Sequence, residues 1–173
     1  IKKIGLASSG VVAVCDAAGK YSLISLSDYS VAASGYSYIG ACSKGLIPVS
    51  QNGKWFFINA KGERVSDATY DDIKVDDYGL AFPGGVAFAK NNGVYTMIDS
   101  DEKALSDTTF VDVGVFYSED AMASMCNNQK WGFTDKTGKT IFNEYAGTGS
   151  FKFGYGSFNS AGKWGFLNSD GKV

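Results

Sequence analysis

The side chains of this chain that could carry out chemistry are carboxylates, thiols and phenols, because its 173 residues include no histidine. Without histidine, Ser-His-Asp triads and Cys-His pairs cannot form, and the commonest ligand of transition metals is missing. We therefore predict a protein with no catalytic residues, no bound cofactor and no metal site.

The three cysteines, Cys15, Cys42 and Cys126, are an odd number at irregular spacing and include no CxxC pair. Disulfide frameworks normally use an even number of cysteines, and zinc sites use closely spaced pairs. The sequence therefore predicts buried or half-buried free thiols.

Acidic residues gather in three short groups, at Asp71-Asp72, at Asp76-Asp77 and from Asp99 to Glu102. Such groups could supply some of the six to eight oxygen ligands that Ca²⁺ takes, or the carboxylate pair of a glycoside hydrolase. However, they lack EF-hand spacing and fall in the most variable segments. We expect them to be solvated turn residues, with calcium binding and glycoside hydrolysis as weaker alternatives.

Composition predicts a folded, all-β protein. The chain is 45% hydrophobic and 20% charged, which is ordinary for a globular fold. Its 22 glycines, 2 prolines and 14% aromatic residues are typical of many short strands joined by tight turns, where glycine supplies positive φ angles.

Charge and hydropathy argue against nucleic acids and membranes as partners. A net charge of −2 and no lysine or arginine run longer than Lys2-Lys3 predict no nucleic-acid partner. No apolar stretch approaches the roughly 20 residues of a membrane span, so we expect no membrane insertion. Because the chain opens at Ile1 and not at methionine, we expect a monomeric domain of a larger protein, whose gene product could include a signal peptide or further domains.

One hairpin motif recurs along the chain at intervals of 34, 40, 36 and 33 residues. The motif has the sequence Gly-Lys-Trp-Phe-Phe-Ile-Asn where it starts at Gly53. It recurs as Lys-Trp-Gly-Phe, starting at Lys130 and again at Lys163. Copies with tyrosine start near Gly19 and Gly93. The repeat aromatics are Tyr21, Trp55, Tyr95, Trp131 and Trp164.

Each unit reads as a β-meander. In the second unit an apolar run precedes Asn52-Gly53, the strongest two-residue hairpin signal, and Trp55 lies on the return strand. We predict one domain of five such units over residues 1–173, with hairpins near 10–28, 45–62, 85–102, 121–138 and 156–173.

At these residues the chain resembles the WG-repeat (KWG-repeat) family of bacterial proteins. Matching segments are Gly45 to Val49 with Asn52 to Trp55, Lys130 to Gly138, and Lys163 to Phe166. Tyrosine at 21 and 95, Phe56 in place of glycine and Gln129 in a turn depart from the pattern. The resemblance implies a noncatalytic repeat module, often in secreted or surface proteins, with no defined ligand.

The ends of the chain suggest how the units are arranged. Residues 4–10 align with residues 39–45, so the chain opens in the late part of a unit, and it ends at Val173, just after the second turn of the fifth hairpin. We predict a five-bladed β-propeller whose N-terminal strand completes the last blade, which would leave only short edges. The alternative is an open superhelical array of stacked β-meanders.

Aromatic residues fall into two classes of predicted role. The five repeat aromatics recur at one phase of every unit, which favours a place in the core. Tyrosines in the longer connections are better candidates for ligand contact, because loops on a rigid scaffold usually carry recognition. These candidates are Tyr36, Tyr38, Tyr70, Tyr78, Tyr117, Tyr145 and Tyr155.

The sequence favours a noncatalytic binding or scaffolding module with a protein or glycan partner. The alternative is a lectin-like carbohydrate-binding domain with equivalent pockets between units, and an enzyme of the glycoside hydrolase type is a third, weaker hypothesis.

Overall fold

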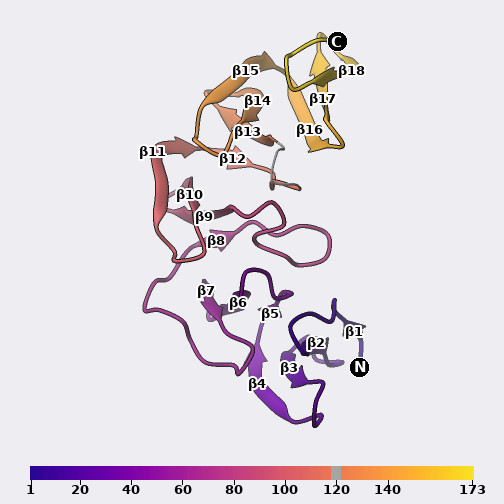
Figure 1. Ribbon diagram of the computed structural model, residues 1–173, viewed down its shortest axis with the longest axis vertical. Coiled ribbons are helices and arrows are strands. Elements are labelled where there is room, and N and C mark those ends of the chain that lie inside the picture. The colour runs from indigo at the N-terminus through magenta and orange to yellow at the C-terminus, as the bar shows by residue number, and fades with distance from the viewer. Residues whose placement is uncertain (118–121) are drawn as a thin grey trace. The chain divides into compact units, whose positions relative to one another are not determined.

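The computed structural model describes residues 1–117 and 122–173 and shows an all-β protein (Figure 1). These residues form 18 strands in five antiparallel sheets and no helix, as predicted from composition. Accordingly, no helix in the described part of the chain could cross a membrane. The chain divides into two compact units, Ile1–Phe82 and Pro83–Val173. A single domain over the whole chain stays a prediction.

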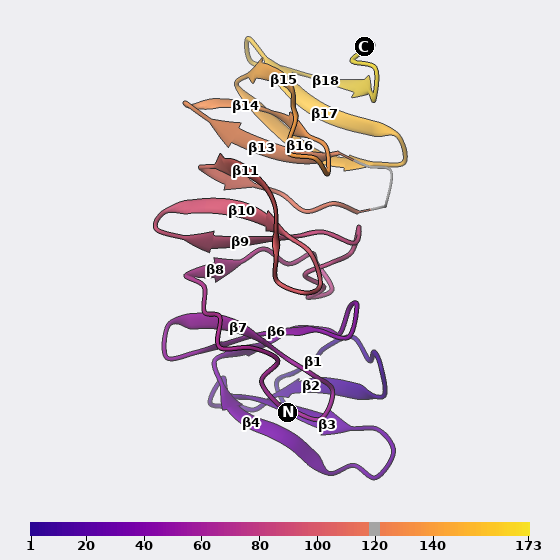
Figure 2. The same cartoon turned by 60° about the vertical axis from the view of Figure 1, so that its left-hand side comes forward.

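The first unit contains two complete meanders, which lie in successive layers (Figure 2). The first sheet has the order β1-β2-β3-β4, and the second has the order β5-β6-β7. Their strands, with the short β8 that follows, are β1 (Lys3–Ile4), β2 (Val11–Cys15), β3 (Tyr21–Ser25), β4 (Val31–Tyr36), β5 (Tyr38–Ile39), β6 (Ile47–Gln51), β7 (Lys54–Ile58) and β8 (Asp72–Ile73).

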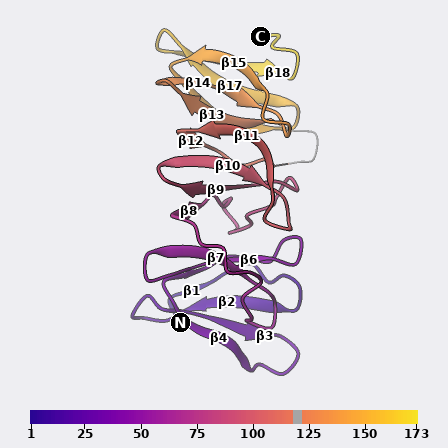
Figure 3. The same ribbon diagram turned by 90° about the vertical axis from the view of Figure 1, so that its left-hand side faces the viewer.

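The second unit holds three further layers (Figure 3). In the third sheet β9 lies beside β10 and β10 beside β11. The fourth has the order β12-β13-β14-β15, and the fifth the order β16-β17-β18. The strands are β9 (Ala87–Asn91), β10 (Val94–Ile98), β11 (Ala104–Phe110), β12 (Asp112–Val113), β13 (Ala123–Asn127), β14 (Lys130–Thr134), β15 (Thr140–Tyr145), β16 (Gly147–Lys152), β17 (Tyr155–Ser160) and β18 (Lys163–Asn168).

The N-terminal strand corrects one prediction. β1 pairs with β2, with Lys3 opposite Cys15 and Ile4 opposite Val14, so it belongs to the first sheet and does not complete the last one. Pairing within this local hairpin closes a short loop, which costs less chain entropy than joining the two ends of the chain. Ring closure itself stays a prediction.

The hairpin turns have the left-handed geometry that the sequence predicts. Asn52 and Gly53, between β6 and β7, have φ angles of 52° and 77°, as a type I′ turn requires. Asn128 and Gln129 take the same place before β14 with φ angles of 48° and 62°, so the missing glycine is tolerated there. The five hairpins pair β2 with β3, β6 with β7, β9 with β10, β13 with β14 and β17 with β18. Residue 121, where the fourth predicted range begins, lies outside the described residues.

A second turn follows four of the five return strands and is closed there by an Asn or Asp side chain. Four residues after the aromatic, this side chain accepts hydrogen bonds from the backbone N–H groups two and four residues further on. Asn59 does so at 2.9 and 3.0 Å, and Asp135 at 2.9 and 3.1 Å. The other two such residues are Asp99 and Asn168.

The core lies between sheets, and equivalent positions of the repeat contribute to it in most units. Strand side chains alternate between the two faces of a sheet, so the repeat aromatic and the residue two positions later share a face. That later residue is buried in four units: Leu23, Phe57, Met97 and Phe133 are at most 1% exposed. In the fifth unit the equivalent Phe166 is 67% exposed.

The fourth and fifth sheets show how closely the layers pack. The Phe133 ring lies 5.7 Å from the Phe151 ring, edge to face, and both pack with Leu167. Gly156 on β17 is required here, because a Cβ atom at this position would lie 2.6 Å from the Phe133 ring. The close approach explains why this strand position carries no side chain.

Removal of the Phe133 ring tests the packing between sheets. Phe133→Ala should lower the free energy of unfolding by about 3–5 kcal/mol, because it leaves a cavity between two layers. Phe153→Ala is the matched control, since Phe153 is 98% exposed and the substitution should cost less than about 0.5 kcal/mol. Urea unfolding followed by tryptophan fluorescence measures both, and equal losses would contradict the layered core.

Acid stability tests the second turn. Partial burial raises the pKa of the Asp135 carboxyl, but hydrogen bonds from Thr137 and Lys139 outweigh it, so the pKa lies below its ordinary value. The resulting stabilisation is present above the unfolded pKa of about 3.9 and is lost as the pH falls through the folded pKa. Asp135→Asn keeps the accepting oxygen, as Asn59 and Asn168 do, without titrating.

We therefore expect the urea midpoint of the wild type to fall more steeply below about pH 4 than that of Asp135→Asn. Equal pH profiles for the two proteins would show that the Asp135 carboxylate does not contribute in this way.

Candidate functional site

A pocket of about 330 Å³ opens in the first unit and is the best candidate for a binding site. This volume is at the lower end of the range for small-molecule sites. Its lining combines phenol rings, one carboxylate, one ammonium group and backbone. The lining residues are Lys3, Ile4, Gly5, Leu6, Tyr21, Tyr38, Ile39, Gly40, Asp77, Tyr78 and Gly79.

One wall of the pocket is the loop that carries Asp77 and Tyr78. Asp76 closes this loop as other Asx residues close the second turns, by accepting hydrogen bonds of 2.9 Å from the N–H groups of Tyr78 and Leu80. The Gly79 carbonyl accepts a bond of 2.9 Å from the Ala41 N–H, which anchors the loop beside β5. The loop is therefore preorganised by its own backbone.

Two glycines allow this loop to approach β5. A Cβ atom on Gly40 would lie 2.4 Å from the Gly79 carbonyl oxygen. One on Gly79, whose φ is +85°, would lie 2.9 Å from the Tyr38 hydroxyl. Larger residues at either position would push the loop and the Tyr38 ring apart.

A row of three aromatic rings from β3, β5 and β7 includes two that line the pocket, Tyr21 and Tyr38. The Tyr38 ring lies 5.6 Å from that of Tyr21 and 5.1 Å from that of Trp55, both in tilted contact. Burial raises the pKa of Tyr38 to about 12, and repulsion from ionised Tyr21 and from the Asp76 carboxylate adds to this effect. Tyr38 therefore presents a neutral, hydrogen-bonding phenol at any ordinary pH.

Two of the seven tyrosines proposed for ligand contact, Tyr38 and Tyr78, meet in this pocket. Tyr36 is half-buried and packs beside Phe56 with ring centroids 6.1 Å apart. Tyr70 and Tyr145 are buried, at 7% and 9% exposure, so both belong to the core.

The remaining two candidate tyrosines lie in the second unit. The Lys152 ammonium group lies 3.7 Å from the centroid of the Tyr117 ring, a cation–π contact that occupies one face of that ring. Tyr155 is 59% exposed on β17. Of the four candidate tyrosines in the first unit, only Tyr38 and Tyr78 thus line the pocket.

The repeat aromatics do not all have the core role predicted for them. Tyr95 is 3% exposed and belongs to the core, and Trp55 and Trp131 are half-buried. The prediction is wrong for Trp164, which is 66% exposed on β18. Tyr21 is half-buried and lines the pocket, a role that the sequence analysis missed.

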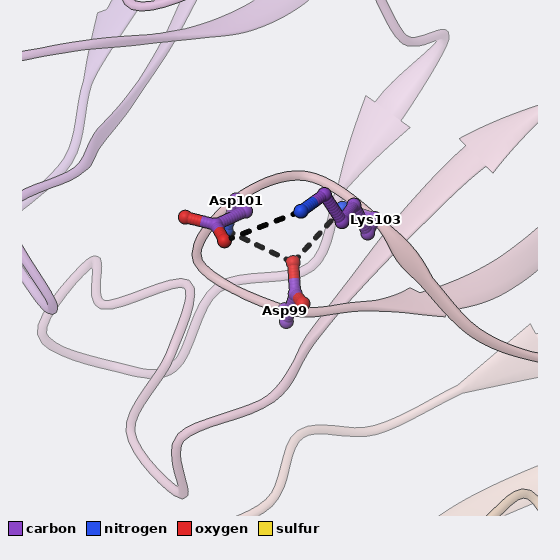
Figure 4. A network of polar contacts seen from close by, with 3 residues as sticks. All are labelled: Asp99, Asp101 and Lys103. Atoms are coloured by element: carbon purple, nitrogen blue, oxygen red, sulfur yellow. Dashed lines mark hydrogen bonds and ion pairs between the residues drawn. The ribbon is translucent and has the colours of Figure 1, made fainter.

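Two of the three acidic groups contain a residue that closes its own turn, Asp76 and Asp99. Figure 4 shows Asp99 accepting the N–H bonds of Asp101 and Lys103, while the Lys103 ammonium group lies 3.6 Å from the Asp101 carboxylate. Asp71 accepts a 2.6 Å bond from Lys54. Within residues 1–117 and 122–173, no group of three His, Cys, Asp or Glu side chains is placed to hold a metal ion.

The cysteine prediction is confirmed. Cys15, Cys42 and Cys126 are buried free thiols. Burial and the nearby Asp112 raise the pKa of Cys126, which disfavours its reactive thiolate form.

Titration of the phenols tests the environment of Tyr38. Because its pKa is raised, the stabilisation from its neutral form is complete below about pH 10 and is lost as the pH rises through about 12. We expect a late step in the tyrosinate absorbance that Tyr38→Phe removes and Tyr29→Phe, at a residue 79% exposed, leaves in place. A late step that survives in Tyr38→Phe would contradict this assignment.

Comparison with known proteins supports the repeat identified from the sequence. The model of the family described as "WG containing repeat" matches residues 31–55 and 55–95. No curated protein matches the chain. The match confirms the resemblance over these residues.

Solved structures share the fold at low sequence identity. The computationally designed Ika8 protein matches with a TM-score of 0.56 and 10% identity, over 95% of this chain and 57% of its own. BamB from Moraxella catarrhalis matches with a TM-score of 0.52 and 13% identity, over 97% of this chain and 61% of its own. The chain thus spans roughly three fifths of the length of either protein, and the likeness shows the fold alone.

Proposed function

We propose that this chain, whose residues 31–95 are WG-containing repeats, is a noncatalytic binding module that holds one sugar unit of a glycan in the pocket of its first unit. The observation that supports this proposal is the meeting of three tyrosines with Asp77 and Lys3 around one cavity of about 330 Å³.

The chemistry of the lining suits a carbohydrate. Sugar rings present C–H groups that stack on aromatic faces and hydroxyl groups that both donate and accept hydrogen bonds. Tyr38 and Tyr78 supply rings with hydroxyl groups, Asp77 supplies an acceptor, and Lys3 supplies a donor. Pockets of this kind combine apolar walls with a few placed polar groups.

Glycoside hydrolysis has less support than binding. Two carboxyl groups must flank the scissile bond, one as an acid and the other as a base or nucleophile. Asp77 lines the pocket, whereas the neighbouring Asp76 accepts two backbone N–H bonds that close the loop. We therefore assign the Asp76 carboxylate a structural role in the loop and not a catalytic one.

Equivalent pockets between all units, as in the lectin alternative, also have less support. Tyr38 lies opposite Ser50 at the start of the second meander. The equivalent positions in the first, fourth and fifth sheets carry Lys3, Asp112 and Gly147. Because none of these is aromatic, we propose one site per chain.

Binding to immobilised glycans, followed by calorimetric titration of the oligosaccharides retained, tests the proposal. We expect about one site per chain, and an affinity at least about tenfold weaker for Tyr78→Ala, because a stacking ring is lost. Tyr78 is 67% exposed, so its removal should leave the fold intact.

Tyr29→Ala is the matched control in the same unit, because Tyr29 is 79% exposed and does not line the pocket. Equal binding by Tyr78→Ala and the wild type, or retention of no glycan by the wild type, would overturn the proposed site. Release of free sugar by the pure protein, lost in Asp77→Asn, would instead establish the enzymatic alternative.

A further inference from the structure

The pocket of the first unit is lined by two charged side chains that do not neutralise each other. Lys3 belongs to β1, and Asp77 belongs to the loop that follows β8. Within residues 1–117 and 122–173, neither of them forms an ion pair. A cation and an anion that line one cavity without meeting leave both charges available to a ligand.

The positive charge enters the pocket from the edge of the first sheet. Lys3 lies opposite Cys15, and Cys15 lies opposite Tyr21, so the three side chains share one face of the sheet. Because neighbouring strands are about 4.8 Å apart, the Lys3 backbone lies roughly 10 Å from that of Tyr21. The lysine is therefore on the far side of Cys15 from the tyrosine.

The negative charge comes from the loop that approaches the tyrosine rings. Asp77 directly precedes Tyr78, and a Cβ atom on the next residue, Gly79, would lie 2.9 Å from the Tyr38 hydroxyl. Burial is the main cause of the raised pKa of Tyr38, and the Asp76 carboxylate of the same loop adds to it. The loop side of the pocket is therefore negative, and aromatic faces there also attract cations.

We infer that the sugar unit held in this pocket carries both an ammonium group and a carboxylate group. The inference rests on the proposed function and names the class of sugar. The ammonium group binds at the Asp77 carboxylate beside the Tyr78 ring, and the carboxylate group binds at Lys3. Charge-assisted hydrogen bonds of opposite sign at the two ends then fix the direction of the sugar in the pocket.

Sugars with a single charge suit this lining less well. An amino sugar without a carboxylate leaves Lys3 unpaired and adds a second cation to the same cavity. A uronic acid without an amine does the same to Asp77 with a second anion. Both side chains are exposed to water, so each favourable contact should change affinity by only a few fold.

Four methyl glycosides separate the two charges in an experiment. Those of glucose, glucosamine, glucuronic acid and muramic acid carry neither charge, the ammonium group, the carboxylate group and both groups, respectively. Titration of the full chain followed by NMR measures the four dissociation constants. We expect muramic acid to bind about tenfold more tightly than glucose, and more tightly than either singly charged sugar. Sodium chloride at about 1 M should reduce these differences.

Charge-removing variants assign the two ends of the site. Lys3→Gln should lower the affinity for the two sugars with a carboxylate and not for the other two. Asp77→Asn should lower the affinity for the two sugars with an ammonium group and not for the others. Lys2→Gln and Asp67→Asn are the matched controls, because neither residue lines the pocket, and both should bind all four sugars as the wild type does.

The outcomes separate this inference from the proposed function. Equal affinity of the wild type for all four sugars would overturn the inference and leave the sugar site in place. Tighter binding of glucosamine or glucuronic acid than of muramic acid would also overturn it. So would equally tight binding of the amino acid serine, which carries both charges without a sugar ring. Binding of none of the four sugars would overturn the proposed function as well.

Discussion

Burial of the side chain two residues after the repeat aromatic, which holds in four of the five units, is the constraint on which the rest of this structure depends. A single meander has two faces and cannot bury either by itself, so its apolar residues become a core only when another sheet covers them. Leu23 and Phe133 are buried in this way, and the close contact of Phe133 with Gly156 shows how little space separates the layers.

The turns serve the same constraint. A register slip of one residue would exchange the two faces of every strand and expose the buried set. Left-handed turns such as Asn52-Gly53 and Asx-closed turns such as that of Asp135 set the register at both ends of the return strand. Variation between units can then collect in the connections without disturbing the core.

The candidate pocket lies where the repeat units differ most in sequence. Tyr38 has no aromatic equivalent in the first, fourth or fifth sheet, and the loop with Asp77 and Tyr78 falls in the longest spacing between repeat aromatics. The repeated residues supply a rigid support, and the irregular ones supply the chemistry. Tyr21 takes part in both, since it marks the repeat and also lines the pocket.

The sequence by itself determined the all-β class, the five hairpins, their turns and the buried free thiols. These features follow from local rules of alternation, turn geometry and spacing, which act over a few residues. Tertiary structure alone decided that β1 joins the first sheet, that Tyr70 is buried and Trp164 exposed, and that Lys3 meets Tyr78 at one pocket. Such features depend on which sheet covers which face, and residues distant in the chain leave no local signal of that choice.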